Sequence, residues 1–300
     1  MIINKGYENT SLRSPIVAMG IFDGVHRGHT ALLNYFVDIA KKSNRETVVI
    51  TFSYPHKHNS CLTTHGEKRE ILSKKGIDHL IEIELDEEFK NMEAVDFIEN
   101  ILVEKINASH IIIGYDQNFG RHCKGNFEML RQYSADFGFT VEQASEFQLD
   151  GNKISSSIIK KLLHEGDLDK ANLLLGYDYK MSGVVIEGKK IGTKLGFPTA
   201  NILPATDKLI PAGGVYAVEV ETKSGYFKGM LNIGISPTIN PANSKISMEV
   251  HIIDFNQNIY NQNISVVFKK RLRNERQFDN IEQLVSQMKL DREETIKVFS

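Results

Sequence analysis

The sequence has few of the residues that build cross-links, membrane spans or polyanion-binding surfaces. Two cysteines, Cys61 and Cys123, lie far apart with no Cys-x-x-Cys spacing, which argues against a disulfide scaffold and against structural zinc. No apolar run approaches the roughly 18 residues that span a bilayer, and the N-terminal segment lacks the apolar core of a secretion signal. The net charge of −2 gives no reason to expect a nucleic-acid surface. These absences predict a cytoplasmic protein that acts on small molecules, without nucleic-acid, membrane or protein partners.

The pattern of predicted elements changes near residue 178, and 300 residues is about twice the usual length of one domain. In the first half, apolar strand-like runs alternate with helical patterns. The expected strands lie at 16–22, 47–52, 79–85 and 109–114, and the expected helices at 32–40, 67–75 and 94–105. Such alternation is typical of an α/β domain with a parallel sheet, which we predict for residues 1–178.

The second half is dominated by short runs rich in Val, Ile and Tyr that are separated by turn residues. Two helical stretches at 154–167 and 168–176 come first. The expected strands lie at 181–187, 215–221, 226–233, 247–255 and 264–272, and a charged helix follows from about Asn280. We predict an all-β domain over 179–300, an antiparallel sheet or small barrel that is closed by a C-terminal helix.

Residues 20–29 read GIFDGVHRGH and lie between a predicted buried strand and a predicted helix. Backbone N–H groups and the helix dipole accept a phosphate at such a position. The first two glycines would let a nucleotide approach the backbone, and Gly28 would let the helix pack against the sheet. His26 and His29 could both face one side of the first turn and donate hydrogen bonds to phosphate oxygens as negative charge grows. For the motif alone, a tight turn with surface histidines is the alternative.

The longer pattern Gly-x-Phe-Asp-Gly-Val-His-x-Gly-His resembles that of bacterial bifunctional riboflavin kinase/FAD synthetases, which share an ATP-holding His-x-Gly-His element with the nucleotidyltransferase superfamily. Further matches follow in order at Thr51–Phe52, Glu67–Lys68, Gly114–Asp116, Asn118–Gly120 and 155–157. The resemblance implies a Rossmann-like nucleotidyltransferase domain with His26 and His29 as catalytic residues. It implies ATP contacts from Gly20, Phe22, Asp23, Gly24, His26, His29, Ser155, Ser156, Ser157 and Lys160, and flavin contacts from Asp116 and Asn118.

These further positions also have ordinary structural interpretations. Asp116 and Asn118 follow a predicted strand, where they could contact ribose, flavin or metal, but such residues in a turn otherwise cap the local backbone. Ser155 to Ser157 and Lys160 could contact triphosphate oxygens at a helix start. An N-cap with a solvated lysine is the alternative for them.

A second motif, GKKIGTKLGFPTANI, occupies residues 188–202. It is a loop dense in glycine and lysine that leads into Pro198, which fixes φ. In an extended segment Thr199 and Asn201 point to the same face. Two neutral oxygen ligands presented together suit a Mg²⁺ ion that bridges ATP phosphates. Taken alone, the string would be a turn with a β-bulge.

The Gly-Phe-Pro-Thr-Ala-Asn string resembles the signature of riboflavin kinases, and this resemblance implies a small antiparallel six-stranded barrel with a C-terminal helix. Similar strand motifs follow at Gly213–Ala217, Asn232–Gly234, Pro237–Thr238, Glu249–Phe255 and Arg271–Arg273, with Glu275 and Phe278. The resemblance implies kinase ATP contacts from Gly188, Gly192, Lys194, Gly196, Pro198, Thr199 and Asn201, Mg²⁺ on Thr199 and Asn201, and flavin contacts from Arg273 and Phe278.

Glu249 is the general base that this resemblance implies, because a carboxylate on a barrel strand can orient the attacking hydroxyl and accept its proton. The structural alternative is an exposed strand glutamate that is paired with a lysine. Arg273 could equally form a surface ion pair, and we expect His251 to be structural.

Both halves together imply that the chain phosphorylates riboflavin to FMN and then adenylylates FMN to FAD, with ATP as co-substrate. Some positions depart from the family pattern. The family usually has phenylalanine where Gln117 stands, arginine where Lys160 and Thr193 stand, and a Thr-Phe-x-Pro-His-Pro string where residues 51–57 differ. Lys189, Lys190 and Lys194 lie close enough in sequence to replace the charge missing at Thr193. A riboflavin kinase with weakened or lost adenylyl transfer, and a non-catalytic flavin-binding protein, are therefore the alternatives.

Overall fold

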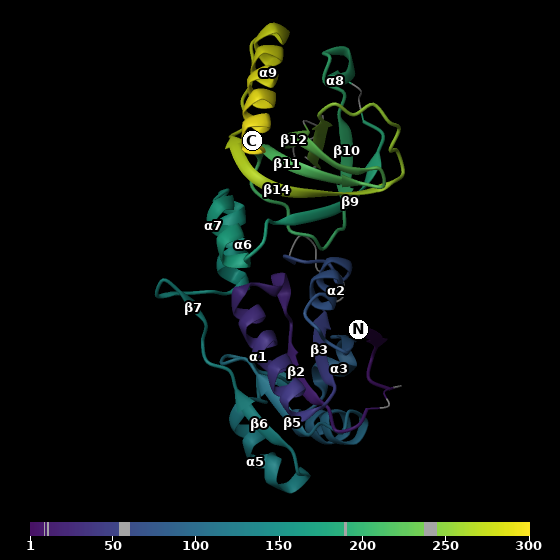
Figure 1. The fold of residues 1–300 in the computed structure, drawn as a ribbon, viewed down its shortest axis with the longest axis vertical. Helices are drawn as coiled ribbons and strands as arrows, with labels where there is room; N and C mark the ends of the chain where they lie inside the picture. Colours follow the sequence, from purple (N-terminus) through teal and green to yellow (C-terminus); the bar gives the residue numbers. More distant parts are fainter. Residues whose placement is uncertain (9, 11, 54–60, 189–190, 237–244) are drawn as a thin grey trace. The chain divides into compact units, whose positions relative to one another are not determined.

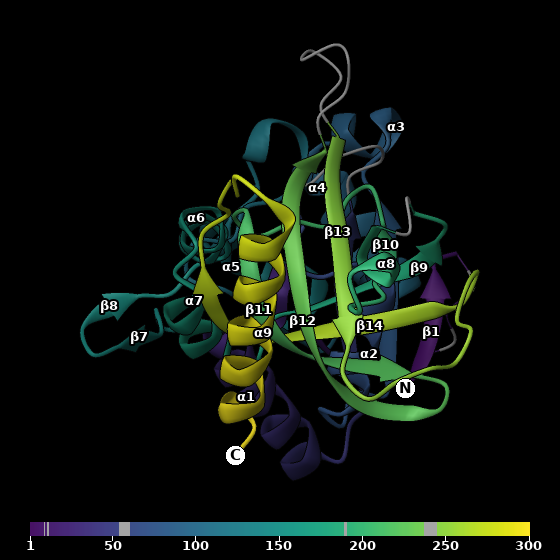
Figure 2. The same ribbon diagram turned by 90° about the horizontal axis from the view of Figure 1, so that it is seen from above.

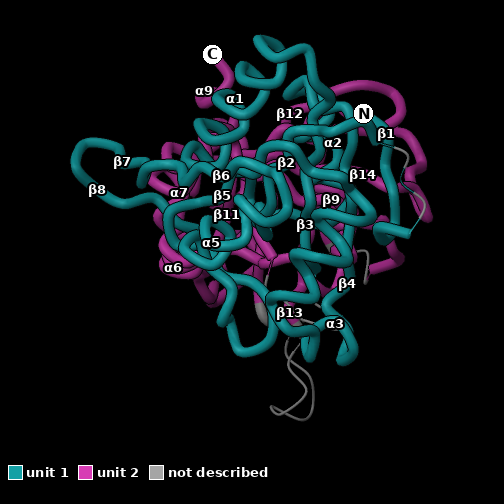
Figure 3. The backbone as a smooth tube through the Cα atoms, turned by 90° about the horizontal axis from the view of Figure 1, so that it is seen from below, with its two compact units in different colours: residues 1–57, 63–156 teal, residues 58–62, 157–300 magenta. Residues whose placement is uncertain are grey.

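The computed structural model describes residues 1–300 apart from 9, 11, 54–60, 189–190 and 237–244 (Figure 1). The described chain forms two compact units, which Figure 3 distinguishes by colour. The first unit comprises residues 1–57 and 63–156. The short segment 58–62 and residues 157–300 form the second unit. The domain boundary at residue 178 stays a prediction.

A six-stranded parallel sheet in the order β1-β4-β3-β2-β5-β6 forms the centre of the first unit. Its strands are β1 (Ile2–Lys5), β2 (Ile16–Gly20), β3 (Thr47–Ser53), β4 (His79–Glu84), β5 (His110–Ile113) and β6 (Thr140–Gln143). Val17 and Met19 of β2 pack into one apolar core, and Ile16 and Ala18 pack into another. Because successive side chains point to opposite faces, a strand that is buried on both faces needs an unbroken apolar run.

Helical segments connect these strands. They are η1 (Asp23–Val25), α1 (Arg27–Ser43), α2 (His65–Ser73), α3 (Glu87–Asn91), α4 (Ala94–Asp96), the π-helical η2 (Phe97–Lys105), η3 (Arg121–Cys123) and α5 (Phe127–Phe137). A hairpin of β7 (Gln148–Leu149) and β8 (Asn152–Lys153) follows the last strand. Helix α2 begins with a capping box, in which Thr64 Oγ1 accepts from the Glu67 backbone N–H at 3.3 Å and Glu67 Oε2 accepts from the Thr64 N–H at 3.0 Å.

The second unit contains a closed barrel of six strands in the order β10-β13-β12-β11-β14-β9, and all pairs are antiparallel. The strands are β9 (Lys180–Ile186), β10 (Ala200–Pro204), β11 (Gly214–Thr222), β12 (Gly225–Ser236), β13 (Lys245–Ile252) and β14 (Asn263–Arg273). The helices are α6 (Ser156–Glu165), α7 (Leu168–Leu175), α8 (Ile191–Lys194) and α9 (Ile281–Val298). The parallel α/β sheet and the six-stranded antiparallel barrel confirm the predicted fold class.

Helix α9 and a short segment from the first quarter of the chain belong to the second unit and lie outside the barrel wall. Helix α9 runs alongside β11 and β12 (Figure 2). The short segment from the first quarter of the chain pairs with residues 207–209: the Cys61 N–H donates to the Asp207 carbonyl at 2.8 Å, and the Leu209 N–H donates to the Cys61 carbonyl at 2.9 Å. The buried Lys208 Nζ donates to the Leu62 carbonyl at 2.6 Å. Within the described residues, no helix combines the length and apolarity needed to cross a membrane.

Candidate active sites

The loop that follows β2 in the first unit has an unusual backbone. Phe22 and Val25 are non-glycine residues with φ of 48° and 37°, and Gly24 has φ of 80°. Positive φ is costly for residues with a bulky side chain, and such strain persists where the surrounding structure holds it in place. The loop therefore needs external support.

Hydrogen bonds from two neighbouring segments supply that support. Thr63 Oγ1 accepts from the Gly24 N–H at 3.0 Å, and the Thr63 N–H donates to Asp23 Oδ1 at 3.3 Å. Ser156 Oγ donates to the Asp23 carbonyl at 2.8 Å. Asp23 and Ser156, both predicted ATP contacts, thus also fix the shape of the loop. Ser157 and Lys160 belong to the second unit, and their role in ATP binding stays a prediction, as does that of Ser155.

The two histidines of the motif stack on each other at the start of α1. Their ring centroids are 3.7 Å apart and the rings are inclined by 15°. His26 is the N-cap, and its Nδ1 accepts from the His29 backbone N–H at 3.3 Å. Phe22 packs edge-on against His29 at 5.2 Å. A Cβ on Gly28 would lie 3.3 Å from the His26 ring. We expected this glycine to let the helix pack against the sheet, but in the structure it makes room for the His26 ring.

Burial keeps both rings neutral at pH 7. It lowers the pKa of His26 to about 4, against the opposing effect of Asp23 and Asp116. Burial also lowers the pKa of His29 well below its usual range, and the nearby His26 and Lys68 add to this effect. Because His26 Nδ1 accepts a hydrogen bond, its proton lies on Nε2. His26 can therefore donate from Nε2 to a ligand oxygen without carrying a full charge.

A buried lysine that the sequence matched only as part of a motif lies beside these histidines. Lys68 of α2 is 5% exposed. Its Nζ donates to the Ile21 carbonyl at 2.7 Å and to Thr51 Oγ1 at 3.1 Å. Apart from that match, nothing in the sequence singles it out, because a lysine in a helical pattern does not reveal whether it is buried. Lys68 brings a positive charge close to His29.

The predicted flavin contacts follow β5 at the carboxyl edge of the sheet. Asp116 is exposed, and Lys153 Nζ lies 3.8 Å from its Oδ2. The same Nζ lies 4.7 Å from the centre of the Tyr115 ring. Asn118 Nδ2 donates to the Asp116 carbonyl at 3.3 Å, which is the local turn contact that we considered as the alternative. Gln117 Oε1 would lie 3.5 Å from a Cβ on Gly20, so the loop after β5 reaches the motif loop.

In the barrel, three polar residues form one row across neighbouring strands. Asn201 of β10 is paired with Glu249 of β13, which is paired with Asn232 of β12. Thr199 Oγ1 donates to Glu249 Oε2 at 3.3 Å. A Cβ on Gly188 would overlap the Asn201 amide. The barrel thus brings Gly188, Thr199, Asn201 and Glu249 together, with Glu249 half-buried and bonded to hydroxyls.

The glycine-rich loop before this row is partly described. Gly192 and Lys194 lie on α8, and Gly196 follows it with φ of 83°. Pro198 is exposed, and its carbonyl lies 2.8 Å from His251 Nδ1. Lys189, Lys190, the variant string at 54–57 and the Pro237–Thr238 motif lie outside the described residues. The predicted ATP contacts in this loop stay predictions.

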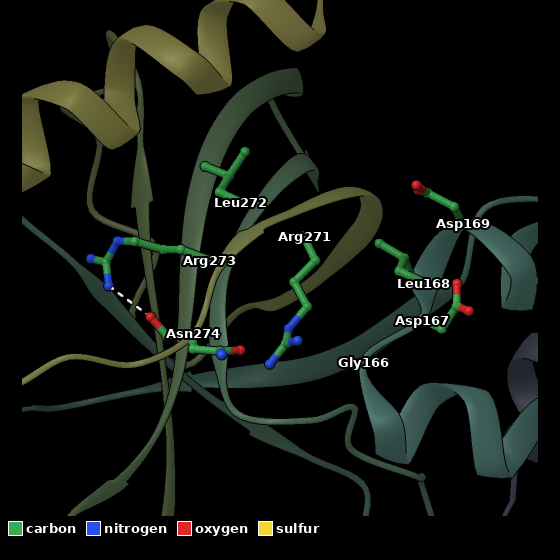
Figure 4. Close-up of a pocket in the computed structure, with 8 residues that line it drawn as sticks. All are labelled: Gly166, Asp167, Leu168, Asp169, Arg271, Leu272, Arg273 and Asn274. Atoms are coloured by element: carbon green, nitrogen blue, oxygen red, sulfur yellow. Dashed lines mark hydrogen bonds between the residues drawn. The ribbon is translucent and has the colours of Figure 1, made fainter.

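Arg273, a predicted flavin contact, is held in an ion pair. Its Nε donates to Asp291 Oδ1 at 2.9 Å, and its Nη2 donates to Asp291 Oδ2 at 2.7 Å. The guanidinium lies 5.9 Å from the centre of the Phe278 ring. Figure 4 shows Arg273 pointing away from Gly166, whereas Arg271 points toward it. These residues border a cavity of about 320 Å³. Its lining consists of Gly166, Asp167, Leu168, Asp169, Arg271, Leu272, Arg273 and Asn274 (Figure 4).

The fold and these two sites define a two-unit protein, with an α/β unit that carries two stacked histidines at the start of α1 and a barrel with a carboxylate–hydroxyl centre. The family described as FAD synthetase matches residues 8–158, and the family described as riboflavin kinase matches residues 175–299. The chain belongs to the bifunctional riboflavin kinase/FMN adenylyltransferase family.

Individual relatives resemble the chain over nearly its whole length. The bifunctional riboflavin kinase/FMN adenylyltransferase of Haemophilus influenzae is 39% identical, with 100% of this chain and 99% of the relative covered. That of Listeria monocytogenes is 34% identical, with 95% and 92% covered. The crystal structure of a macrolide-efflux protein from Streptococcus pneumoniae has a TM-score of 0.88 and 29% identity, with 98% of this chain and 99% of that chain covered.

Proposed function

We propose that this chain phosphorylates riboflavin to FMN with one ATP and then converts FMN to FAD with a second ATP, releasing pyrophosphate. The observation that carries the proposal is that each unit gathers its own reactive set. His26 and His29 stack at a helix N-terminus in the first unit. Thr199 and Glu249 are hydrogen-bonded beside Asn201 in the second.

In the kinase step, Glu249 accepts the proton of the riboflavin 5′-hydroxyl while the oxygen attacks the γ-phosphorus of ATP, whose bond to the β,γ-bridging oxygen breaks so that ADP leaves. Thr199 can donate its proton to Glu249 and still offer its oxygen lone pairs to a cation. Mg²⁺ would be held by Thr199 and Asn201, and when bound it would neutralise phosphate charge. This donor set fits the ion, because Mg²⁺ takes hard oxygen ligands and the barrel register places Asn201 next to Glu249, to which Thr199 is hydrogen-bonded.

In the adenylyl transfer step, a phosphate oxygen of FMN attacks the α-phosphorus of ATP and pyrophosphate leaves. His26 and His29 donate hydrogen bonds to phosphate oxygens as charge grows in the transition state. Lys68 supplies a fixed positive field beside them. Positioning and electrostatics suffice for both steps, and neither step needs a covalent intermediate.

The test is incubation of the purified chain with riboflavin, ATP and Mg²⁺, with the flavins separated by chromatography. FAD as product is the expected result. FMN as the sole product would support a kinase without adenylyl transfer, which the departures at Gln117 and Lys160 make the second candidate. Recovery of unchanged riboflavin would overturn both enzymatic readings in favour of a flavin-binding protein.

A further inference from the structure

Three polar residues alternate along the strand that carries Glu249. Ser247, Glu249 and His251 occupy every second position of β13, so their side chains lie on one face of the strand. Ser247 Oγ donates to Glu249 Oε1 at 3.1 Å, while Thr199 Oγ1 donates to Oε2 at 3.3 Å. The carboxylate therefore receives one hydroxyl hydrogen bond on each of its oxygens.

His251 contacts the loop that delivers Thr199. Its Nδ1 lies 2.8 Å from the Pro198 carbonyl. A carbonyl can only accept, so Nδ1 carries the proton and donates. The Phe197 ring packs edge-on against the imidazole, with 5.3 Å between centroids and 68° between planes. His251 thus holds the two residues that immediately precede Thr199.

We propose that Ser247 and His251 are positioning residues of the kinase site, acting on Glu249 and on Thr199 respectively. This inference rests on the proposed function. A free glutamate side chain has several rotamers, and a base that is fixed in advance loses less entropy when the substrate hydroxyl arrives. Each Glu249 oxygen keeps further lone pairs for the substrate proton after accepting one hydrogen bond. The strand places a support on either side of the base in a single run of five residues.

The two supports have different kinetic signatures. Loss of the Ser247 hydroxyl leaves the substrates' contacts intact and loosens only the base, so kcat should fall. Loss of the His251 donor releases Pro198 and displaces Thr199, which is a ligand-binding residue in the proposed function. The KM for ATP should then rise, with a smaller change in kcat.

The experiment measures FMN formation by the full chain for matched pairs of variants. Ser247→Ala should lower kcat roughly tenfold, the effect of one lost hydrogen bond to a charged group, with both KM values within about twofold of wild type. Ser247→Thr keeps the hydroxyl and should recover most of the activity. His251→Leu should raise the KM for ATP about tenfold, whereas His251→Asn, which retains a donor at the same distance from the backbone, should not. Ser265→Ala is the control, because its hydroxyl pairs with Ser182 at 2.9 Å elsewhere in the barrel.

Thermal unfolding of the same preparations reports whether the barrel of each variant is folded, and conversion of added FMN to FAD by the first unit should stay unchanged. The inference is overturned if Ser247→Ala matches wild type while Glu249→Gln is inactive, or if Ser247→Thr fails to recover activity. It is also overturned for His251 if the leucine and asparagine variants behave alike. A fully active Glu249→Gln, or a wild type that makes no FMN, would instead overturn the proposed function and the inference with it.

Discussion

The stacked rings of His26 and His29 are neutral near pH 7 because burial lowers both pKa values. A neutral imidazole is a directional hydrogen-bond donor that does not attract counterions. The positive field comes from Lys68, whose Nζ is fixed by the Ile21 carbonyl and Thr51. The first site therefore separates hydrogen-bond donation from charge and assigns them to different residues.

The low pKa of His26 predicts a loss of stability in acid. An unfolded histidine takes up a proton below about pH 6.5, whereas folded His26 resists protonation down to about pH 4. The contribution of neutral, buried His26 to the free energy of unfolding is thus present above pH 6.5 and lost as the pH falls toward 4. Between pH 7.5 and pH 5 this amounts to about 2 kcal/mol. Urea unfolding should show this loss for wild type, and a smaller one for His26→Asn, which keeps an N-cap acceptor. Parallel pH dependence of the two proteins would contradict the assignment.

The two units should lose their activities separately. His29→Ala removes a phosphate donor from the first site, so FAD formation should fall by about 10²-fold or more while FMN formation is spared. Glu249→Ala removes the base from the barrel, so FMN formation should fall by about 10²-fold or more while added FMN is still converted to FAD. Chromatography of both product mixtures checks the prediction. A folded variant that loses both activities would show that the division of labour is wrong.

Lys68, Ser247 and His251 mark the limit of residue-level prediction. His26, His29, Thr199, Asn201 and Glu249 were found because their types and spacing form known patterns. Lysine and serine have no such spacing when they support another residue. Ser247 lies two positions before Glu249 on the same strand, where a serine has no special pattern, and the other two residues make their contacts across elements. Lys68 reaches Ile21 across 47 positions, and His251 reaches Pro198 across 53.

At the scale of elements, periodicity located the buried strands and α1, but not the short or edge elements. The predicted strand at 47–52 became β3 (Thr47–Ser53) because its alternate residues pack into two cores. Strand β1 (Ile2–Lys5) was missed, since it is an exposed edge strand with a partly polar sequence. Helix α5 (Phe127–Phe137) was missed although Phe127, Leu130 and Phe137 recur at helical spacing, and Leu130 is its one fully buried residue. Strand β1 gives no strong hydrophobic period.

The loop between β9 and β10 gives an element-scale prediction. A Cβ on Gly188 would overlap the Asn201 amide, so Gly188→Ala should push Asn201 away from the row that contains Glu249. The Mg²⁺ concentration for half-maximal kinase activity should rise about tenfold, with adenylyl transfer unchanged. Gly66→Ala is the matched control, because a Cβ on that α2 residue meets no atom within 4 Å, and both activities should be kept. An unaltered Mg²⁺ requirement in Gly188→Ala would argue against Asn201 as a ligand.

At the scale of the whole molecule, two family models match the chain one after the other, at residues 8–158 and 175–299. The change from α/β alternation to short strands was visible in the sequence because the two folds need different hydrophobic periods. The participation of residues 61–62 in the second unit was not. No local pattern shows that a segment between β3 and α2 pairs with residues 207–209.

This pairing predicts that the second unit is incomplete as a fragment. In residues 157–300 alone, the buried Lys208 lacks the Leu62 carbonyl, at a cost of about 1–3 kcal/mol. The barrel should therefore unfold at a lower temperature in the fragment than in the full chain. Lys208→Met should stabilise the fragment but destabilise the full chain. The same sign of effect in both backgrounds would contradict the prediction.

The bond between Lys208 and Leu62 also bears on the order in which the protein is made. The two residues are 146 positions apart, so the segment at 61–62 leaves the ribosome long before its partner is synthesised. Thr63, the next residue, belongs to the first unit and supports Asp23 and Gly24 in the loop after β2. Biosynthesis thus delivers residues 61–62, a piece of the second unit, before most of the first unit has been made.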